Sequence, residues 1–345
     1  MEINVGNVII GSKFIPVQTM IKNHISNLDK TINKLNKLSN IGCDIVRVAI
    51  PDKKSAISLK NILKYSTIPI VADIHFDYKL AIMSIQAGVH KIRINPGNII
   101  NKKYIKNIID CLKEYNIPVR IGINSGSLPV HLIKKYNNDI LKVMIESAKE
   151  EIKFFEKYGY GKIVLSFKSS NVKDMINVNK FAKNEFDFPL HIGVTEAGDI
   201  IDGTIKNTAG LSILLNQGIG DTIRVSLTSS EENEVKVGKK ILESLGLRES
   251  NIDIISCPTC GRTEVDIEKI VNKLKQVISK IRLKKNIKIA VMGCVVNGPG
   301  EAKNSDFGVA CGKNKSIIFK NGKKIKVIKN DLILDELLLV LNEYL

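Results

Sequence analysis

Between residues 16 and 227 the chain repeats one pattern, in which a short apolar segment is followed by an amphipathic segment of helical length. The apolar segments are rich in Val and Ile, which is typical of strands buried on both faces of a parallel sheet. Eight segments share the pattern: Pro16–Met20, Asp44–Ile50, Ile68–His75, Lys91–Asn95, Pro118–Asn124, Lys162–Lys168, Pro189–Glu196 and Thr222–Leu227. Eight β/α units over about 210 residues predict an α/β fold, a (β/α)8 TIM barrel. The alternative, a doubly wound open sheet, usually has a Gly-rich turn after its first strand, and none follows Met20.

The pattern changes after residue 246. A helix expected over Glu232–Leu245 leads into the polar segment Gly246–Asn251, where we place the boundary between a barrel domain (1–246) and a second domain (247–345). The second domain favours the helices Glu264–Leu283 and Asp331–Tyr344 and the strands Ile252–Ser256, Lys288–Met292, Phe307–Ala310, Ser316–Lys320 and Lys323–Ile328. Asn321-Gly322 between the last two strands is a strong hairpin signal. We therefore expect a small α+β domain after the barrel.

The chain is strongly basic, with 52 Lys and Arg against 35 Asp and Glu and a net charge of +17. Such a charge is typical of chains that bind nucleic acid, a membrane surface or a small polyanion. Only seven of the 52 basic residues are Arg, and Trp is absent, which indicates an AT-rich genome rather than a selected basic surface. Aromatic residues are 5% of the chain and do not alternate with a basic cluster, so we expect no nucleic-acid partner.

The sequence gives no sign of a membrane or secretory protein. It has no run of 18 apolar residues, and its N-terminus lacks the basic and apolar regions of a signal peptide. The six cysteines suit a reducing compartment and a metal site better than a disulfide framework. We therefore expect a cytoplasmic protein.

The few arginines have an unusual distribution. Four of the seven lie within predicted strands: Arg47, Arg93, Arg120 and Arg224. A guanidinium group offers phosphate a rigid fork of donors, and a buried charge is costly unless it is paired. We therefore expect these side chains to hold one polyanionic ligand, such as a diphosphate, at the mouth of the barrel. The alternative is structural pairing with carboxylates, for which Asp44, Asp73 and Glu196 supply only part of the charge.

Polar residues also end nearly every predicted strand, and in a TIM barrel those ends carry the active site. Besides the arginines these residues include Asp73, His75, Asn124, Lys168, Thr195, Glu196 and Ser226. His75 and Glu196 are the candidates for acid–base catalysis, although a strand-end His is as often a hydrogen-bonded structural residue. Glu196 follows Thr195 on a turn flanked by Gly, where a carboxylate is well placed over a bound ligand.

The second domain contains a compact cysteine motif. Cys257 and Cys260 form a Cys-x-x-Cys pair, and Cys294 follows in a loop rich in Gly and Pro. The pair alone fits a redox dithiol, zinc or iron–sulfur chemistry. Structural zinc requires a fourth Cys or His. No His follows His191, and Cys311 is available but follows a predicted strand and has no partner motif. Three thiolates favour a [4Fe–4S] cluster with one unusual iron, while zinc and a dithiol remain open.

Several motifs, taken together, resemble those of the 4-hydroxy-3-methylbut-2-enyl diphosphate synthase family over essentially the whole chain. They are Val17–Met20, Asp44–Val48, Val71–Asp77, Ile92–Asn98, Val119–Ser127, Thr195–Gly198, Gly218–Leu227, Cys257–Cys260 and Gly293–Glu301. The resemblance implies a two-domain enzyme, with a barrel that binds a cyclic diphosphate and a C-terminal domain that carries a [4Fe–4S] cluster. It matches the cluster ligands to Cys257, Cys260, Cys294 and Glu301, and spacing alone does not reveal Glu301.

The resemblance also implies roles for the barrel residues. The diphosphate positions match Arg47, Arg93, Arg120, Asn124, Lys168, Arg224 and Ser226, and the pocket lining matches Asp73, His75 and Thr195. Glu196 matches the acid–base carboxylate. The implied reaction is a reductive ring opening and dehydration of 2-C-methyl-D-erythritol 2,4-cyclodiphosphate, in which Glu301 exchanges for a substrate oxygen. The implied partners are flavodoxin or ferredoxin as electron donor and a second copy of the chain. The alternative is a zinc-stapled barrel that binds nucleic acid or another anion.

Overall fold

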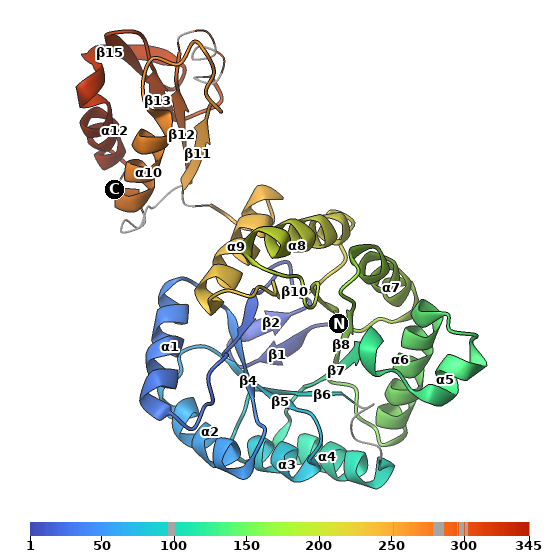
Figure 1. Ribbon diagram of the computed structural model, residues 1–345. Coiled ribbons are helices and arrows are strands. Elements are labelled where there is room, and N and C mark those ends of the chain that lie inside the picture. Colours follow the sequence, from blue (N-terminus) through green and yellow to red (C-terminus); the bar gives the residue numbers. More distant parts are fainter. Residues whose placement is uncertain are drawn as a thin grey trace. The chain divides into compact units, whose positions relative to one another are not determined.

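The computed structural model describes residues 1–95, 101–250, 252–278, 286–294, 296, 300 and 303–344. The chain divides into two compact units, Met1–Arg248 and Glu249–Leu345 (Figure 1). Each unit has its own hydrophobic core. Within the described residues, no helix combines the length and the apolar character needed to cross a membrane.

The first unit is built on parallel strands joined side by side. These are β3 (Gln18–Met20), β4 (Ile45–Ala49), β5 (Ile70–Ile74), β6 (Lys91–Ile94), β7 (Val119–Asn124), β8 (Ile163–Lys168), β9 (His191–Ile192) and β10 (Thr222–Ile223). Strands β3 to β8 form one parallel sheet in sequence order, and β9 pairs with β10. Single parallel bridges, Leu165 with Leu190 and Val17 with Ile223, join the two sheets at both edges. All eight predicted strands are confirmed.

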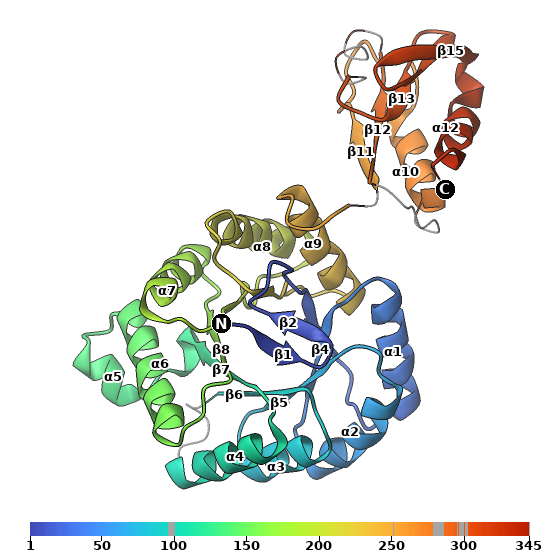
Figure 2. The ribbon, with the colours of Figure 1, turned by 180° about the vertical axis from the view of Figure 1, so that it is seen from behind.

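Helices cover the outside of these strands, as the two opposite views show (Figures 1 and 2). They are α1 (Leu28–Asn40), α2 (Lys53–Tyr65), α3 (Tyr78–Gln86), α4 (Lys102–Tyr115), α5 (Val130–Lys135), α6 (Ile140–Lys157), α7 (Val172–Glu185), α8 (Ile200–Leu215) and α9 (Glu231–Ser244). Apart from α5, each begins after an Asn, Asp or Ser whose side chain accepts a hydrogen bond from a backbone N–H of the first turn. These caps satisfy donors that a helix cannot pair internally, so they fix where each loop ends.

Strands β9 and β10 are shorter than predicted, because the chain leaves the ladder after Ile192 and Ile223. Beyond those points the backbone bonds to loops instead: Thr195 N donates to Ser169 O at 3.3 Å, and Thr228 N donates to Gly198 O at 2.8 Å. The polar strand ends therefore lie on loops held by the barrel.

A hairpin at the start of the chain, β1 (Ile3–Val5) and β2 (Val8–Ile10), was not predicted from the sequence. Its apolar side chains pack against residues near the amino ends of β4, β5 and β8, in one cluster of Ile3, Val5, Ile10, Ile45, Val71 and Val164. The hairpin therefore covers the end of the barrel opposite the polar strand ends.

The second unit is a five-stranded sheet with helices on one face. Its strands are β11 (Ile252–Ser256), β12 (Ile287–Met292), β13 (Phe307–Ala310), β14 (Lys315–Lys320) and β15 (Lys323–Lys329), in that order. β11, β12 and β13 are parallel, and the β13–β14 and β14–β15 pairs are antiparallel. Helices α10 (Ile267–Ile278) and α12 (Ile333–Asn342) share a core with the sheet. The predicted α+β architecture and hairpin are confirmed.

Candidate functional site

The arginines of the barrel are brought together by strand register. Asp73, Arg93 and Arg120 are aligned on the neighbouring strands β5, β6 and β7. Arg47 is aligned with Met20 on β3, and its guanidinium contacts the Met20 sulfur, with Nη2 at 2.9 Å. Side chains alternate along a strand, so aligned residues of parallel strands project to the same side. The register therefore gathers cations that lie far apart in the sequence.

Asp73 is the central carboxylate of this group. Its Oδ1 accepts a hydrogen bond from Arg93 Nη1 at 3.1 Å, and its Oδ2 lies 3.5 Å from Arg47 Nε and 3.5 Å from His75 Nε2. Burial raises the pKa of the Asp73 carboxyl, but Arg47, His75 and Arg93 outweigh it and hold that pKa below its usual value. Asp73 is therefore ionised and fixes two of the arginines.

The cations outnumber the carboxylates. Those that are buried or largely buried in the barrel are Arg47, Lys91, Arg93, Arg120, Lys168 and Arg224. Among the described residues, only Asp73 and Glu234 form ion pairs with any of them. Burial, Arg224 and Arg93 lower the pKa of Arg47 to about 9, against the opposing effect of Asp73. Structural ion pairing therefore leaves most of this charge unbalanced, which favours an anionic ligand.

Two expected contributors to the charge balance lie elsewhere. Asp44 pairs with Arg248, with Oδ1 2.7 Å from Nη2, and also accepts a hydrogen bond from Val17 N. Glu196 is exposed, and its backbone has a φ of 51°. A positive φ is uncommon for a residue with a side chain and occurs often at functional sites. Glu196 is thus exposed on a loop and, among the described residues, forms no ion pair with an arginine.

The remaining predicted site residues lie around the same end of the barrel. Asn124 ends β7 in register with Lys168, which ends β8 and is buried. Thr195 and Ser226 are partly buried on the loops after β9 and β10. His75 Nε2 is 3.2 Å from Arg93 Nη1 as well as close to Asp73, so its ring belongs to the charged group. The structure thus brings the predicted barrel residues to one end of the strands.

Gly122 creates the space that Arg93 needs. A Cβ atom at Gly122 would lie 3.0 Å from Arg93 Nη2 and 2.8 Å from Arg93 Nε, and the second distance is shorter than Cβ contacts in real proteins. Gly122 is two residues after Arg120 on β7, so it projects to the same side. A side chain there would displace the guanidinium group from Asp73.

The parallel pairing of β11 and β12 brings the cysteine motif of the second unit to one edge of the sheet. β11 and β12 are parallel neighbours, so the segments that follow them leave the same edge of the sheet. Cys257 N donates to Val291 O at 3.3 Å, and Cys257 Sγ accepts a hydrogen bond from Gly293 N at 3.1 Å. Cys257, Cys260 and Cys294 line one pocket. In the described part of the chain, however, no three Cys, His, Asp or Glu side chains are grouped as ligands of one metal ion.

Two further residues bear on this second site. Cys311 follows β13 at the same edge, but it is fully buried, and burial raises the pKa of its thiol to about 11. It is therefore a small buried side chain rather than an accessible thiolate. Glu301, the expected fourth ligand, lies outside the described residues.

Sequence reasoning missed two charged residues of the barrel. Lys91 begins β6 and is fully buried, and Glu234 is a buried carboxylate on α9. A lysine two residues before Arg93 in an apolar strand was a usable signal for the first. Glu234 had none, because it acts through contacts with residues far away in the sequence.

These observations define a class of protein. A ring of parallel β/α units whose carboxyl end gathers unbalanced arginines is typical of a barrel enzyme that holds a phosphorylated substrate. Residues 1–239 match the family model described as "GcpE TIM-barrel domain", and residues 253–343 match "GcpE protein C-terminal domain". The chain therefore belongs to the GcpE family.

Curated relatives agree over nearly the full length. The chain is 49% identical, over 98% of its own length and 95% of the relative's, to a protein of Caldanaerobacter subterraneus subsp. tengcongensis. It is 48% identical, over 98% and 96%, to one of Clostridium acetobutylicum. Both are named "4-hydroxy-3-methylbut-2-en-1-yl diphosphate synthase (flavodoxin)". Among solved structures, dihydropteroate synthase of Yersinia pestis resembles 71% of this chain and 99% of its own at a TM-score of 0.51 and 14% identity, which speaks only for the fold.

Proposed function

We propose that this chain converts 2-C-methyl-D-erythritol 2,4-cyclodiphosphate to 4-hydroxy-3-methylbut-2-enyl diphosphate, a step of the methylerythritol phosphate pathway to isoprenoids. The observation that carries the proposal is the group of Arg47, Arg93 and Arg120, in which Asp73 pairs with Arg47 and Arg93 and no described carboxylate pairs with Arg120. A cyclic diphosphate supplies negative charge at one place and the oxygen acceptors that guanidinium forks require. The two relatives are named as synthases of the same linear diphosphate product.

The barrel residues bind and orient the substrate. Arg47, Arg93, Arg120 and Arg224 hold the diphosphate oxygens, with Asn124, Lys168 and Ser226 as further donors and Thr195 in the lining. Asp73 keeps Arg47 and Arg93 in place and orients His75 beside them. Because the guanidinium groups are buried, their attraction for the anion is screened less than at the surface.

The second unit supplies the residues for a [4Fe–4S] cluster: Cys257, Cys260, Cys294 and Glu301. The geometry of the described residues suits such a group, because Gly293 leaves a cradle beside the first cysteine. A Cβ at Gly293 would lie 3.1 Å from Cys257 Sγ and 2.8 Å from Thr263 Cγ2. The thiolates that hold such a cluster would bind different iron atoms. Cysteines that line one pocket therefore suit a cluster even though they are not grouped around a single metal ion. When bound, the cluster supplies two electrons that flavodoxin or ferredoxin delivers.

The reaction breaks the ring C–O bond to the diphosphate, takes up two electrons and releases one hydroxyl group as water. Glu196 is the acid–base group, and it holds the proton that the departing hydroxyl oxygen requires. Its exposed position on the loop after β9 allows it to approach the substrate from outside the arginine group. The proposal includes a homodimer in the cytoplasm as the working form.

The function is tested with the full chain purified without oxygen. We expect about four iron atoms per chain and conversion of the cyclic diphosphate to the linear product with reduced flavodoxin. Zinc in place of iron, without turnover, would reject the proposal. If that protein also bound nucleic acid with a steep dependence on salt, the barrel would be a binding module.

A further inference from the structure

Glu234 is a buried carboxylate that the proposed reaction does not use. It lies in the first turn of α9, and its side chain is 1% exposed. An ionised carboxylate in such a position is costly unless its oxygens are fully paired. The partners of the Glu234 carboxylate therefore indicate its role.

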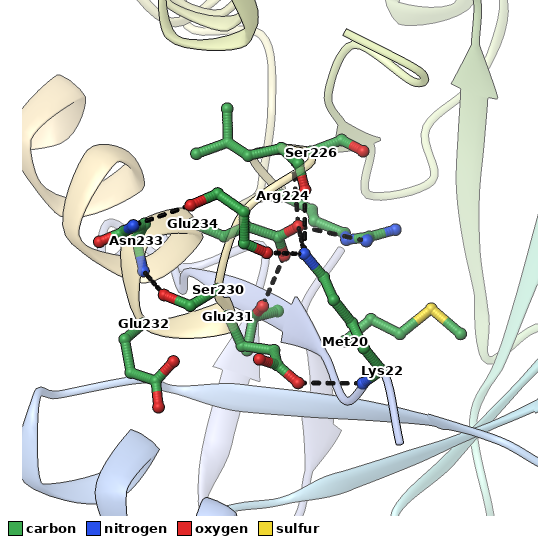
Figure 3. Close-up of polar contacts among 12 residues, drawn as sticks. Met20, Lys22, Arg224, Ser226, Ser230, Glu231, Glu232, Asn233 and Glu234 are labelled. Atoms are coloured by element: carbon green, nitrogen blue, oxygen red, sulfur yellow. Dashed lines mark hydrogen bonds and ion pairs between the residues drawn. The ribbon is translucent and has the colours of Figure 1, made fainter. Parts of the chain in front are cut away.

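These partners come from both sides of one seam of the barrel (Figure 3). Glu234 Oε2 accepts a hydrogen bond from Thr19 Oγ1 of β3 at 2.7 Å, and Oε1 accepts one from Leu227 N, after β10, at 3.2 Å. Among the described residues, the segments of β3 and β10 are joined by a single parallel bridge, between Val17 and Ile223, and by a hydrogen bond from Thr222 Oγ1 to Pro16 O at 3.1 Å. Glu234 thus connects two edges that the sheet holds weakly.

Two cations complete the group. Glu234 Oε1 lies 3.3 Å from Lys22 Nζ and 3.8 Å from Arg224 Nη2. Lys22 Nζ also donates to Leu227 O at 2.9 Å and to Ser229 O, so it ties down the segment after β10. Lys22 and Arg224 line a pocket at the mouth of the barrel. A movement of this group therefore changes the place where a ligand enters.

Glu234 positions Arg224 without occupying its hydrogen-bond donors. Its contact with Glu234 is longer than a hydrogen bond, and its Nε has no hydrogen-bond partner among the described residues. One corner of the guanidinium is thus fixed by charge, and its donors stay available for an anion. Asp73 plays the corresponding part for Arg47 and Arg93.

We propose that Glu234 is a positioning residue for the anion site, which sets Arg224 through its contacts with Thr19, Lys22 and Leu227. The proposal rests on the proposed function for the identity of the substrate. The proposal predicts the direction in which anion affinity changes when Glu234 is neutralised. If Glu234 only reduced the positive charge, its neutralisation would strengthen anion binding. If it positions Arg224, neutralisation weakens binding, because an amide cannot accept hydrogen bonds with both of its terminal atoms.

The test compares Glu234→Gln and Glu234→Asp with Glu232→Gln as the matched control in the full chain. Glu232 lies in the same turn, but its ion pair is with Lys34 on α1. We expect Glu234→Gln to raise both the KM for the cyclic diphosphate and the Kd for inorganic pyrophosphate about tenfold, with kcat within about twofold. Glu234→Asp retains the charge and restores part of the affinity. An unchanged or lower Kd in folded Glu234→Gln overturns the proposal.

If Glu234→Gln does not fold, Thr19→Val decides the question, because it removes the hydrogen bond to Glu234 Oε2 without changing any charge. We expect the same rise in KM and Kd at a smaller size, and wild-type values would overturn the proposal. The pyrophosphate measurement separates this inference from the proposed function. Failure of the wild type to convert the cyclic diphosphate rejects the function, whereas the Kd values still decide the role of Glu234.

Discussion

At the scale of single residues, the charge that matters is the buried part of the +17 total. Lys91 is the extreme case. It is fully buried, and its ammonium nitrogen has no hydrogen-bond partner among the described residues. Burial first, then Arg120 and Arg47, lower the pKa of Lys91 well below its usual value. A buried amine without a hydrogen-bond partner is costly, so Lys91 lowers the stability of the barrel.

We expect Lys91→Met to stabilise the protein by about 1–3 kcal/mol at pH 7, since it removes an unsatisfied buried amine. The sign follows from proton linkage: the folded pKa of Lys91 is lowered, so the unfolded chain binds more protons and wild-type stability falls as pH falls below about 10.4. The gain from Lys91→Met is therefore larger at pH 7 than at pH 10. Urea unfolding at both pH values measures it.

Lys60→Met, an exposed substitution on α2, is the control and changes stability little at either pH. Other titrating groups are the same in the wild type and in Lys91→Met, so the difference between their pH profiles isolates Lys91. A Lys91→Met protein less stable than the wild type at pH 7 would contradict this account, because it would mean that the ammonium group is stabilised.

At the scale of elements, periodicity located the strands and helices, and local chemistry located many helix starts. The runs of β4 and β8 are mostly apolar and are buried at nearly every position, which is typical of a strand covered on both faces. The hairpin of β1 and β2 escaped prediction because each strand has three residues, too few to show a period. The hairpin matters because its apolar side chains cover Ile45, Val71 and Val164 near the amino ends of the barrel strands.

Ile10→Ala in that hairpin is expected to lower the free energy of unfolding by about 2–5 kcal/mol, because it opens a cavity against Ile45 and Val71. Ile9→Ala is the matched control in the same strand, since Ile9 is 42% exposed. We expect it to change stability by less than about 0.5 kcal/mol. Denaturant unfolding compares the two, and equal effects would show that the hairpin does not close the barrel core.

At the scale of the whole molecule, the two units have separate cores with no shared residue. The arginines of the proposed anion site, Arg47, Arg93, Arg120 and Arg224, belong to the first unit, and Cys257, Cys260 and Cys294 belong to the second. The proposed chemistry therefore divides along the chain, with anion binding before residue 249 and electron supply after it.

A chain of residues 1–248 is accordingly expected to fold by itself and to bind inorganic pyrophosphate within about threefold of the full protein. It should not convert the cyclic diphosphate, because Cys257, Cys260 and Cys294 are absent. Circular dichroism with thermal unfolding measures folding, and calorimetry measures binding. A folded fragment that fails to bind pyrophosphate would show that the second unit contributes to the anion site.

The sequence by itself determined the eight parallel strands, the second α+β unit, the barrel arginines and the cysteine motif. Each depends on local information: a period, a turn dipeptide, or a residue type retained against the drift of composition. Tertiary structure alone decided how charges are matched. Asp44 pairs with Arg248, Asp73 with Arg47 and Arg93, and Glu234 with Arg224, over separations from about ten residues to 204. Such pairings depend on register and packing between elements, because Coulomb energy depends on distance in space and on burial, neither of which a linear pattern contains.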